Sequence, residues 1–416
     1  MIVVSDSWVQ SLISAIAAVV AVVQPAAPLP PEGGQPPAQV RKAGDWVGSW
    51  ATAVTEADKT GLSATGVANA TLRQVTHLSV GGSSVRVRLS NRFGTRPLVV
   101  GRTTVVPRKT MPAATPNVEI LQVLPITFRG KGAVTIPVGA EVMSDPLALP
   151  VAEDSDLVVS TYFPTATGPL TQHPAGYATA FSAYGEQTAG GGPQYRKVPG
   201  MARFVVSEVD VRGTARGALV LFGDSITDGA ATPMDKNLRY PDQLADLLIL
   251  RGVGALNAGI AGNRLLANAG NSGEAAIGRF ERDVVRRTGV QGVVVLEGIN
   301  DIRLTRGAIS ATQVIAAHRQ LIARAHAAGL KAYGATLTPY WASPQYTVGG
   351  EIARQAVNHW IRTSGEYEGV VDFEAAVRDP KQPLRIMPGY DSGDHLHPNA
   401  AGFSAMARSF DLNLVG

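Results

Sequence analysis

The sequence contains no cysteine among its 416 residues. Disulfide bonds, thiolate catalysis and cysteine-ligated metal sites are therefore excluded. Charged residues make up only 17% of the chain. There are 37 basic and 33 acidic side chains, and the basic ones form no dense Lys/Arg block. A net charge of +4 spread in this way gives no reason to expect nucleic acid as a partner.

Long apolar runs are also scarce, and the run at residues 12–23 is too short to cross a membrane comfortably. Small residues and a Pro-rich stretch follow it, as in a secretory signal peptide, although Asp6 and the lack of Lys or Arg before the run depart from that pattern. A buried helix is the alternative, but a Pro-rich tract seldom follows a core helix. We expect residues 1–44 to be a signal-like segment and linker, the protein to be secreted, and its mature form to lack a stable membrane span.

The chain is longer than one hydrophobic core usually organises, and its first half has the periodicity of strands. Apolar and charged side chains alternate in VRVRL at residues 85–89 and in EVDV at residues 208–211, as in half-buried strands. Glycine, proline, asparagine and aspartate separate many short runs of this kind. This pattern predicts an all-β, jelly-roll-like sandwich domain over residues 45–213.

Residues 214–416 instead alternate continuous apolar runs with helical stretches. The runs lie at residues 218–222, 292–296, 331–336 and 370–373. Such a succession predicts a parallel sheet covered on both faces. Ligands bind such sheets beyond the carboxyl ends of the strands, which is where catalytic residues are to be sought.

One of the helices between these strands is well delimited. It begins at a capping box formed by Ser310 and Gln313 and ends at Gly329. His318 and His326 lie on it, and we interpret both as residues of the helix surface or rim.

A serine follows the first of the buried strands. Ser225 lies in GDSIT at residues 223–227, where its hydroxyl would face the ligand edge of the sheet beside free backbone N–H groups. A phosphate loop is one alternative, but the lysine that such a loop requires is missing. A simple helix cap is the other alternative.

Glycines and an amide follow two further strands. NAGIAGN occupies residues 257–263 and EGIND residues 297–301. Backbone donors at glycines and a side-chain amide such as that of Asn300 are the groups that a tetrahedral oxyanion needs. Taken separately, glycines also make turns, and Asn-Asp commonly begins a helix.

A histidine and an aspartate occur close together near the C-terminus, in DHLHPN at residues 394–399. Pro398 disfavours helical geometry at His397, so this imidazole should lie on a loop. Asp394 is near enough to orient it and to stabilise its charged form, as a general base requires. His395 is a rival base, but it neighbours Asp394 directly and would usually point elsewhere.

Together these four blocks resemble those of the SGNH/GDSL hydrolases, in that family's order, from residue 218 to the C-terminus. The resemblance implies a flavodoxin-like three-layer α/β/α fold and hydrolysis of carboxylic esters without a metal or another cofactor. It assigns Ser225 as the nucleophile, His397 as the base and Asp394 as its orienting acid. It also implies an oxyanion hole made by the backbone N–H groups of Ser225 and Gly262 and by the Asn300 side chain.

The segments NAGIAGNRLL and LEGINDI, at residues 257–266 and 296–302, look like the acetylxylan-esterase-like branch. A β-sandwich ahead of the hydrolase domain is similar to two-domain polysaccharide deacetylases. The resemblance implies short acyl groups on a carbohydrate, so that an acylated polysaccharide would be the substrate. Tyr340 and Trp341 would stack on a sugar or line an acyl pocket, and packing under the adjacent loop is their alternative.

Two other functions are compatible with the sequence. One is a lipase, phospholipase or polyester hydrolase of the same family. The other is a carbohydrate-binding protein with a vestigial hydrolase domain, which is weakened by the presence of every catalytic residue type. For an enzyme, we expect the sandwich to contribute only indirectly, so that a folded fragment from about Gly213 would still hydrolyse small esters.

Overall fold

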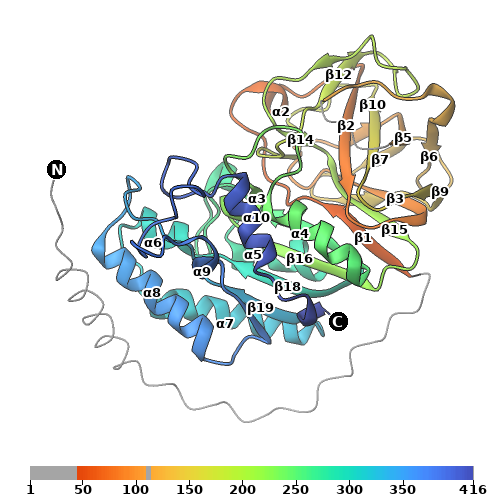
Figure 1. Ribbon diagram of the computed structural model, residues 1–416. Helices are drawn as coiled ribbons and strands as arrows, with labels where there is room; N and C mark the ends of the chain where they lie inside the picture. The colour runs from red at the N-terminus through yellow and green to blue at the C-terminus, as the bar shows by residue number, and fades with distance from the viewer. Residues whose placement is uncertain (1–44, 109–113, 416) are drawn as a thin grey trace.

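The structure is a computed structural model that describes residues 45–108 and 114–415 (Figure 1). The predicted signal-like segment, residues 1–44, lies outside the described residues. Strands dominate the N-terminal part, whereas strands and helices alternate in the C-terminal part. Of the helices formed by the described residues, none is both long and apolar enough to cross a membrane.

Two antiparallel sheets make up most of the N-terminal part. Its elements are β1 Trp46–Ala51, α2 Gly61–Thr65, β2 Ala70–Leu78, β3 Gly82–Ser90, β4 Leu98–Val100, β5 Arg102–Arg108, β6 Leu124–Ile126, β7 Val134–Ile136, β8 Glu141–Met143, β9 Leu147–Val151, β10 Ser155–Phe163, β11 Gln172–His173, β12 Phe181–Tyr184, β13 Arg196–Lys197, β14 Arg203–Phe204 and β15 Val206–Arg212. One sheet has the order β1-β15-β3-β8, with β9 also on β3, and the other β13-β12-β2-β10-β5-β6. Because β1, β2, β3 and β5 alternate between the sheets, this is the predicted jelly-roll-like sandwich.

The predicted alternation holds for β3 but not for β15. In β3, buried apolar residues alternate with partly exposed arginines. In β15, the carboxylates of Glu208 and Asp210 are fully buried, so the prediction of a half-buried strand was wrong there. Arg88 and Arg86 each donate to one of them at 2.7 Å, and the Thr288 N–H of the C-terminal part donates to Glu208. These partners offset the burial of Glu208, whereas burial still raises the pKa of Asp210 to about 7.

The C-terminal part is built on a five-stranded parallel sheet. Its strands are β16 Gly217–Gly223, β17 Val253–Gly259, β18 Val290–Leu296, β19 Lys331–Ala335 and β20 Gly369–Val371. All neighbouring strands are parallel, in the order β17-β16-β18-β19-β20. The first strand in the sequence is therefore second in the sheet, which is the flavodoxin-like order.

Helices cover both faces of this sheet. They are α3 Ser225–Asp228, α4 Tyr240–Leu248, α5 Ala276–Phe280, α6 Ile299–Leu304, α7 Ala311–Ala327, α8 Val348–Thr363, α9 Phe373–Val377 and α10 Ala400–Arg408. Every residue of β16 is buried, and since successive side chains point to opposite faces, both faces must be covered. The capping box of Ser310 and Gln313 opens α7 as predicted. The result is the predicted three-layer α/β/α fold (Figure 1).

The two parts pack closely against each other. The Gly48 N–H in β1 donates to the Thr288 carbonyl at 2.8 Å, and the Ala255 N–H in β17 donates to the Ser79 hydroxyl at 3.0 Å. A Cβ on Gly48 would lie 2.8 Å from a methyl group of Leu256, so the Leu256 side chain would have to shift to admit a larger residue. We propose that the domain boundary falls between β15 and β16, near residue 213. One apolar core cluster extends through both parts, so a fragment beginning there would expose a large apolar surface.

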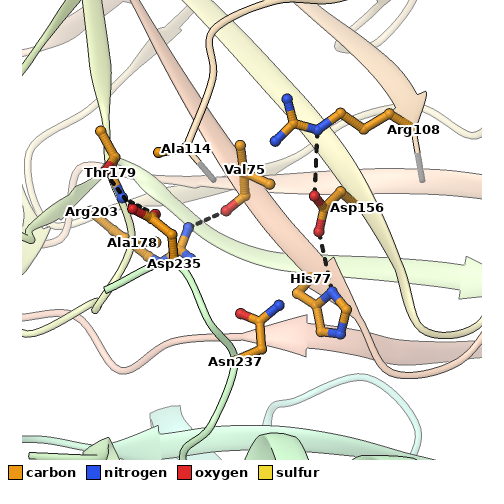
Figure 2. A pocket seen from close by; sticks show the side chains of 10 residues that line it. All are labelled: Val75, His77, Arg108, Ala114, Asp156, Ala178, Thr179, Arg203, Asp235 and Asn237. Carbon is orange, nitrogen blue, oxygen red and sulfur yellow. Dashed lines mark hydrogen bonds and ion pairs between the residues drawn. The ribbon is translucent and has the colours of Figure 1, made fainter. Parts of the chain in front are cut away.

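A small polar pocket also lies between the two parts (Figure 2). Asp235, in the loop after α3, accepts hydrogen bonds from the backbone N–H and the hydroxyl of Thr179 at 2.6 and 2.7 Å. Nearby, the carboxylate of Asp156 bridges Arg108 and His77. None of the residues predicted for catalysis lines this pocket, so it is separate from the site described next.

Candidate active site

The chain turns sharply between β16 and α3, and Ser225 lies at that turn. A Cβ on Gly223 would lie 2.1 Å from the Thr227 hydroxyl oxygen, so a glycine is needed before the serine. The N-cap of α3 is Asp224, whose side chain accepts the Ile226 N–H at 2.9 Å. Ser225 is thus the first residue of the helix and does not cap it, which removes the alternative of a simple cap.

The loop before α10 brings a histidine to this serine. His397 Nε2 lies 2.8 Å from Ser225 Oγ, and His397 Nδ1 lies 2.5 Å from Asp394 Oδ2. Ser225 is only 6% exposed, whereas His397 is partly exposed. The three side chains form a continuous hydrogen-bonded chain in the order Ser, His, Asp.

Asp394 is held as a carboxylate. Burial alone would raise its pKa, but hydrogen bonds from the ring and the backbone N–H of His397 outweigh that effect and hold the pKa of Asp394 well below its usual range. The Leu396 N–H also donates to it, at 2.9 Å. Since an ionised carboxylate can only accept, it fixes the proton on His397 Nδ1 and leaves Nε2 to accept from the serine hydroxyl.

Two backbone N–H groups lie at the ends of β16 and β17. The Ser225 N–H belongs to the first residue of a helix and has no intrahelical acceptor. Gly262 has a φ of +75°, and a Cβ there would lie 2.6 Å from Ser272 Oγ. Within residues 45–108 and 114–415, the Gly262 N–H makes no hydrogen bond. Both N–H groups are available to a ligand oxygen.

The side chain of Asn300 is buried beside them and is already engaged. Its Nδ2 donates to the Asn263 carbonyl at 2.8 Å and, more weakly, to Asp224 Oδ2 at 3.3 Å, while its Oδ1 accepts from Arg303 Nε at 2.7 Å. The N-cap of α6 is Gly298, without a side-chain cap, so Asn300 is not the helix cap. The sequence placed an amide at this edge of the sheet, and the structure shows that hydrogen bonds orient it from both ends.

Comparison with known families decides what kind of domain this is. Residues 221–405 match the model of the GDSL-like lipase/acylhydrolase family. The C-terminal part belongs to this family. The chain is therefore a carboxylic ester hydrolase, as the sequence predicted. No curated protein matches the chain.

Several solved structures are similar to this GDSL-like part. A lipolytic protein of the G-D-S-L family from Desulfitobacterium hafniense DCB-2 is 17% identical, with a TM-score of 0.37 over 46% of this chain and 97% of that one. A GDSL-like lipase from Bacteroides thetaiotaomicron VPI-5482 is 19% identical, with a TM-score of 0.35 over 46% and 84%. A single-residue variant of an acetyl xylan esterase from Geobacillus stearothermophilus is 21% identical, with a TM-score of 0.36 over 48% and 94%.

Beneath the GDSL-like site lies a buried arginine that sequence reasoning missed. Arg279 in α5 donates to the carbonyls of Gly223 and Ala258, both at 2.8 Å, and to Asn263 Oδ1 at 2.9 Å. It also pairs at 3.1 Å with Glu297, whose pKa is raised well above its usual value by burial. One guanidinium thus joins the carboxyl ends of three neighbouring strands. The only local signal was a charged residue within the otherwise apolar stretch AIGRF at residues 276–280.

The rival base of the GDSL-like site has a different partner. His395 Nδ1 lies 2.6 Å from Asp391 Oδ2, and its side chain is half exposed. His395 lies between Asp394 and His397 in the loop. Its backbone φ is +62°, which is unusual for a residue other than glycine. The two successive histidines therefore pair with different aspartates, and only His397 contacts Ser225.

One of the two helix histidines is not where the sequence suggested. His326 is partly exposed and pairs with Glu368 at 2.6 Å, as expected of a rim residue. His318 is fully buried, so its interpretation as a surface residue was wrong. Its ring lies between the Tyr367 hydroxyl at 2.6 Å and the Glu297 carbonyl at 3.1 Å. Burial lowers the pKa of His318 to about 4, which keeps this ring neutral.

The two aromatic residues after β19 also differ from each other. Tyr340 is completely buried, and its ring centroid lies 5.2 Å from that of Tyr346. The structure therefore contradicts a sugar-stacking role for Tyr340, and the alternative of packing under a loop applies. Trp341 is 40% exposed and can be reached by a ligand.

Proposed function

We propose that the protein is a serine esterase that removes short acyl groups, acetyl in particular, from a carbohydrate. The observation that carries the reaction is the chain of hydrogen bonds from Ser225 through His397 to Asp394, at 2.8 and 2.5 Å. The substrate class is supported by the acetylxylan-esterase-like segments of the sequence and by the jelly roll that precedes the hydrolase. Secretion, proposed from residues 1–44, would bring the enzyme to extracellular polysaccharide.

In the acylation step, Ser225 Oγ attacks the ester carbonyl while its proton passes to His397 Nε2. The imidazolium that forms is stabilised by the carboxylate of Asp394. The carbonyl oxygen becomes an anion, and the N–H groups of Ser225 and Gly262 donate to it. The site therefore neutralises both charges that arise during the attack.

The remaining steps return the site to its starting state. The imidazolium of His397 gives its proton to the departing alkoxide, and the alcohol leaves with an acyl group bound to Ser225. A water molecule, losing a proton to His397, then attacks the acyl-enzyme. Collapse of this second intermediate releases the carboxylic acid and restores the serine hydroxyl.

Asn300 is proposed as the third donor. The oxyanion would take over its weaker hydrogen bond, the one to Asp224, while the bonds to Asn263 and Arg303 keep the amide in place.

We expect Asn300→Ala to lower kcat for p-nitrophenyl acetate by roughly 10²–10³-fold and to leave KM nearly unchanged, because the donor acts mainly on developing charge. Asn300→Asp should be slower still, since it puts a carboxylate beside Asp224 and beside the anion.

A buried asparagine elsewhere provides the matched control for this prediction. Asn358 in α8 bonds both backbone groups of Leu337 and is equally buried. Asn358→Ala should lower the melting temperature but leave kcat unchanged. If Asn300→Ala behaved in the same way, with a lower melting temperature and normal kcat, Asn300 would be a structural residue only.

The substrate proposal is tested by a series of p-nitrophenyl esters from acetate to palmitate. We expect kcat/KM to be highest for acetate and to fall as the chain lengthens, and we expect acetate release from acetylated xylan. A maximum at long chains would favour the lipase or polyester hydrolase alternative. No turnover of any ester would favour the carbohydrate-binding alternative.

A further inference from the structure

A histidine of the jelly roll lies against the helix that begins with Ser225. His173, in β11, is 2% exposed, and its Nε2 lies 2.8 Å from Asp228 Oδ1. Asp228 is the last residue of α3 and is equally buried. On the other side of the ring, His173 Nδ1 lies 2.7 Å from the Ala53 carbonyl oxygen.

The partners of this ring fix its protons. The Ala53 carbonyl can only accept, so Nδ1 carries a hydrogen. His173 Nε2 faces a carboxyl group, so one further proton lies between the two, on the ring or on Asp228. In either form a hydrogen bond joins His173 to Asp228. A hydrogen bond between an imidazolium and a carboxylate is stronger than one between two neutral groups. The pair is inaccessible to water and therefore poorly screened.

The other oxygen of Asp228 reaches the second donor loop. Asp228 Oδ2 accepts the Ala261 N–H at 2.8 Å, and Ala261 immediately precedes Gly262. α3 and this loop are also in close backbone contact, because a Cβ on Gly259 would lie 2.3 Å from the Asp228 nitrogen. One carboxyl group thus joins the helix that carries Ser225 to the loop that carries Gly262.

β11 itself is well anchored. The backbones of Thr55 and Gln172 exchange hydrogen bonds at 2.6 and 3.2 Å, and His173 pairs with Arg203 across β11 and β14. The jelly roll therefore offers Asp228 a ring in a fixed position. Such a ring can hold Asp228 in place, which a mobile surface side chain could not do.

We infer that His173 is a positioning residue that the jelly roll supplies to the esterase site. Acting through Asp228, it sets the separation of the Ser225 and Gly262 N–H groups that bind the oxyanion. This inference rests on the proposed function. It replaces the expectation that the sandwich acts only indirectly. Since the two donors act mainly in the transition state, their misplacement should lower kcat far more than it raises KM.

The test uses the full-length protein and p-nitrophenyl acetate. We expect Asp228→Ala to lower kcat by about 10²-fold and His173→Leu by roughly 10-fold or more, with KM changed little, because small misplacements of reacting groups have effects of this size. Asp228→Asn should keep kcat within about threefold of the wild type. Its Oδ1 can still accept the Ala261 N–H, and its Nδ2 can donate to the lone pair on His173 Nε2.

The double variant His173→Leu with Asp228→Ala separates coupling from independent damage. If the two residues act as one unit, this variant should be no slower than Asp228→Ala alone. The matched control is Ser79→Ala, which removes another buried hydrogen bond between the two parts, at the beginning of β17 and away from the site. It should lower the melting temperature and leave kcat unchanged.

The inference is overturned if His173→Leu and Asp228→Ala, assayed well below their melting temperatures, keep the kcat of the wild type. It is equally overturned if Asp228→Asn, the variant most certain to fold, is as slow as Asp228→Ala. Failure of the proposed function would look different. In that case Ser225→Ala would remain active, whereas an inactive Ser225→Ala beside a normal His173→Leu would remove this inference alone.

Discussion

Ser225→Ala is expected to lower kcat for p-nitrophenyl acetate by about 10⁶-fold, the loss seen when a triad serine is removed from other hydrolases. The reason is that Ser225 Oγ is the atom proposed to bond to the acyl group, and alanine offers no nucleophile in its place. A residual rate of about 10³–10⁴ over water should remain, since the donors to the oxyanion are still present. Steady-state and burst kinetics with the same ester check both values.

The fold of this variant should be preserved. Among the residues that the structure describes, the Ser225 side chain hydrogen-bonds to His397 alone, and the helix it begins is capped by Asp224. A change of at most a few degrees in melting temperature is therefore expected. Ser63→Ala, which removes another buried serine hydroxyl in α2 of the jelly roll, is the control and should keep full activity. Undiminished turnover by Ser225→Ala would end the assignment of the nucleophile.

His397→Ala should cost about as much as Ser225→Ala, because the serine loses the group that takes its proton. The doubly substituted protein should be no slower than either single variant, since the two residues act as a unit. His395→Ala is the matched control. It removes a neighbouring imidazole that is paired with Asp391, and kcat should stay within about twofold of the wild type.

Asp394→Asn extends the same experiment. The substituted amide can donate to His397 Nδ1, which places the ring proton on Nε2 and leaves the serine hydroxyl without an acceptor. A loss of about 10⁴-fold in kcat is expected, smaller than for His397→Ala. If His395→Ala were the inactive variant and His397→Ala the active one, the base would have to be reassigned to His395.

The fold and the nearness of Ser225, Gly262 and Asn300 could be predicted because both follow from strand ends, whereas the pairing of Ser225 with His397 was implied by the resemblance to the SGNH/GDSL hydrolases. A parallel sheet collects the residues that follow its strands at one edge, so GDSIT, NAGIAGN and EGIND had to lie near one another. Pro398 kept His397 out of the last helix. These are local patterns combined with one general rule, and the structure brings together the residues that they indicated.

Other features depended on contacts that no local pattern reveals. His318 had a signal that was overlooked, since it shares a helix face with Val314 and Leu321 at spacings of four and three residues. The contact between His173 and Asp228 had none, because it joins residues 55 positions apart in two differently built parts of the chain. Glu208 and Asp210 are buried because arginines and a backbone N–H from other elements bind their carboxyl groups. The alternation of apolar and charged residues in their strand did not indicate this.

The arginine beneath the strand ends limits how this enzyme can be redesigned. Arg279 donates to two backbone carbonyls and pairs with Asp283 and Glu297, so replacing any one of these three side chains removes buried hydrogen bonds beneath the strand ends. A mutant library aimed at a new substrate should therefore keep all three fixed. Its diversity belongs at exposed positions such as Trp341 and His395, where new side chains can meet a ligand without disturbing the groups that carry out the reaction.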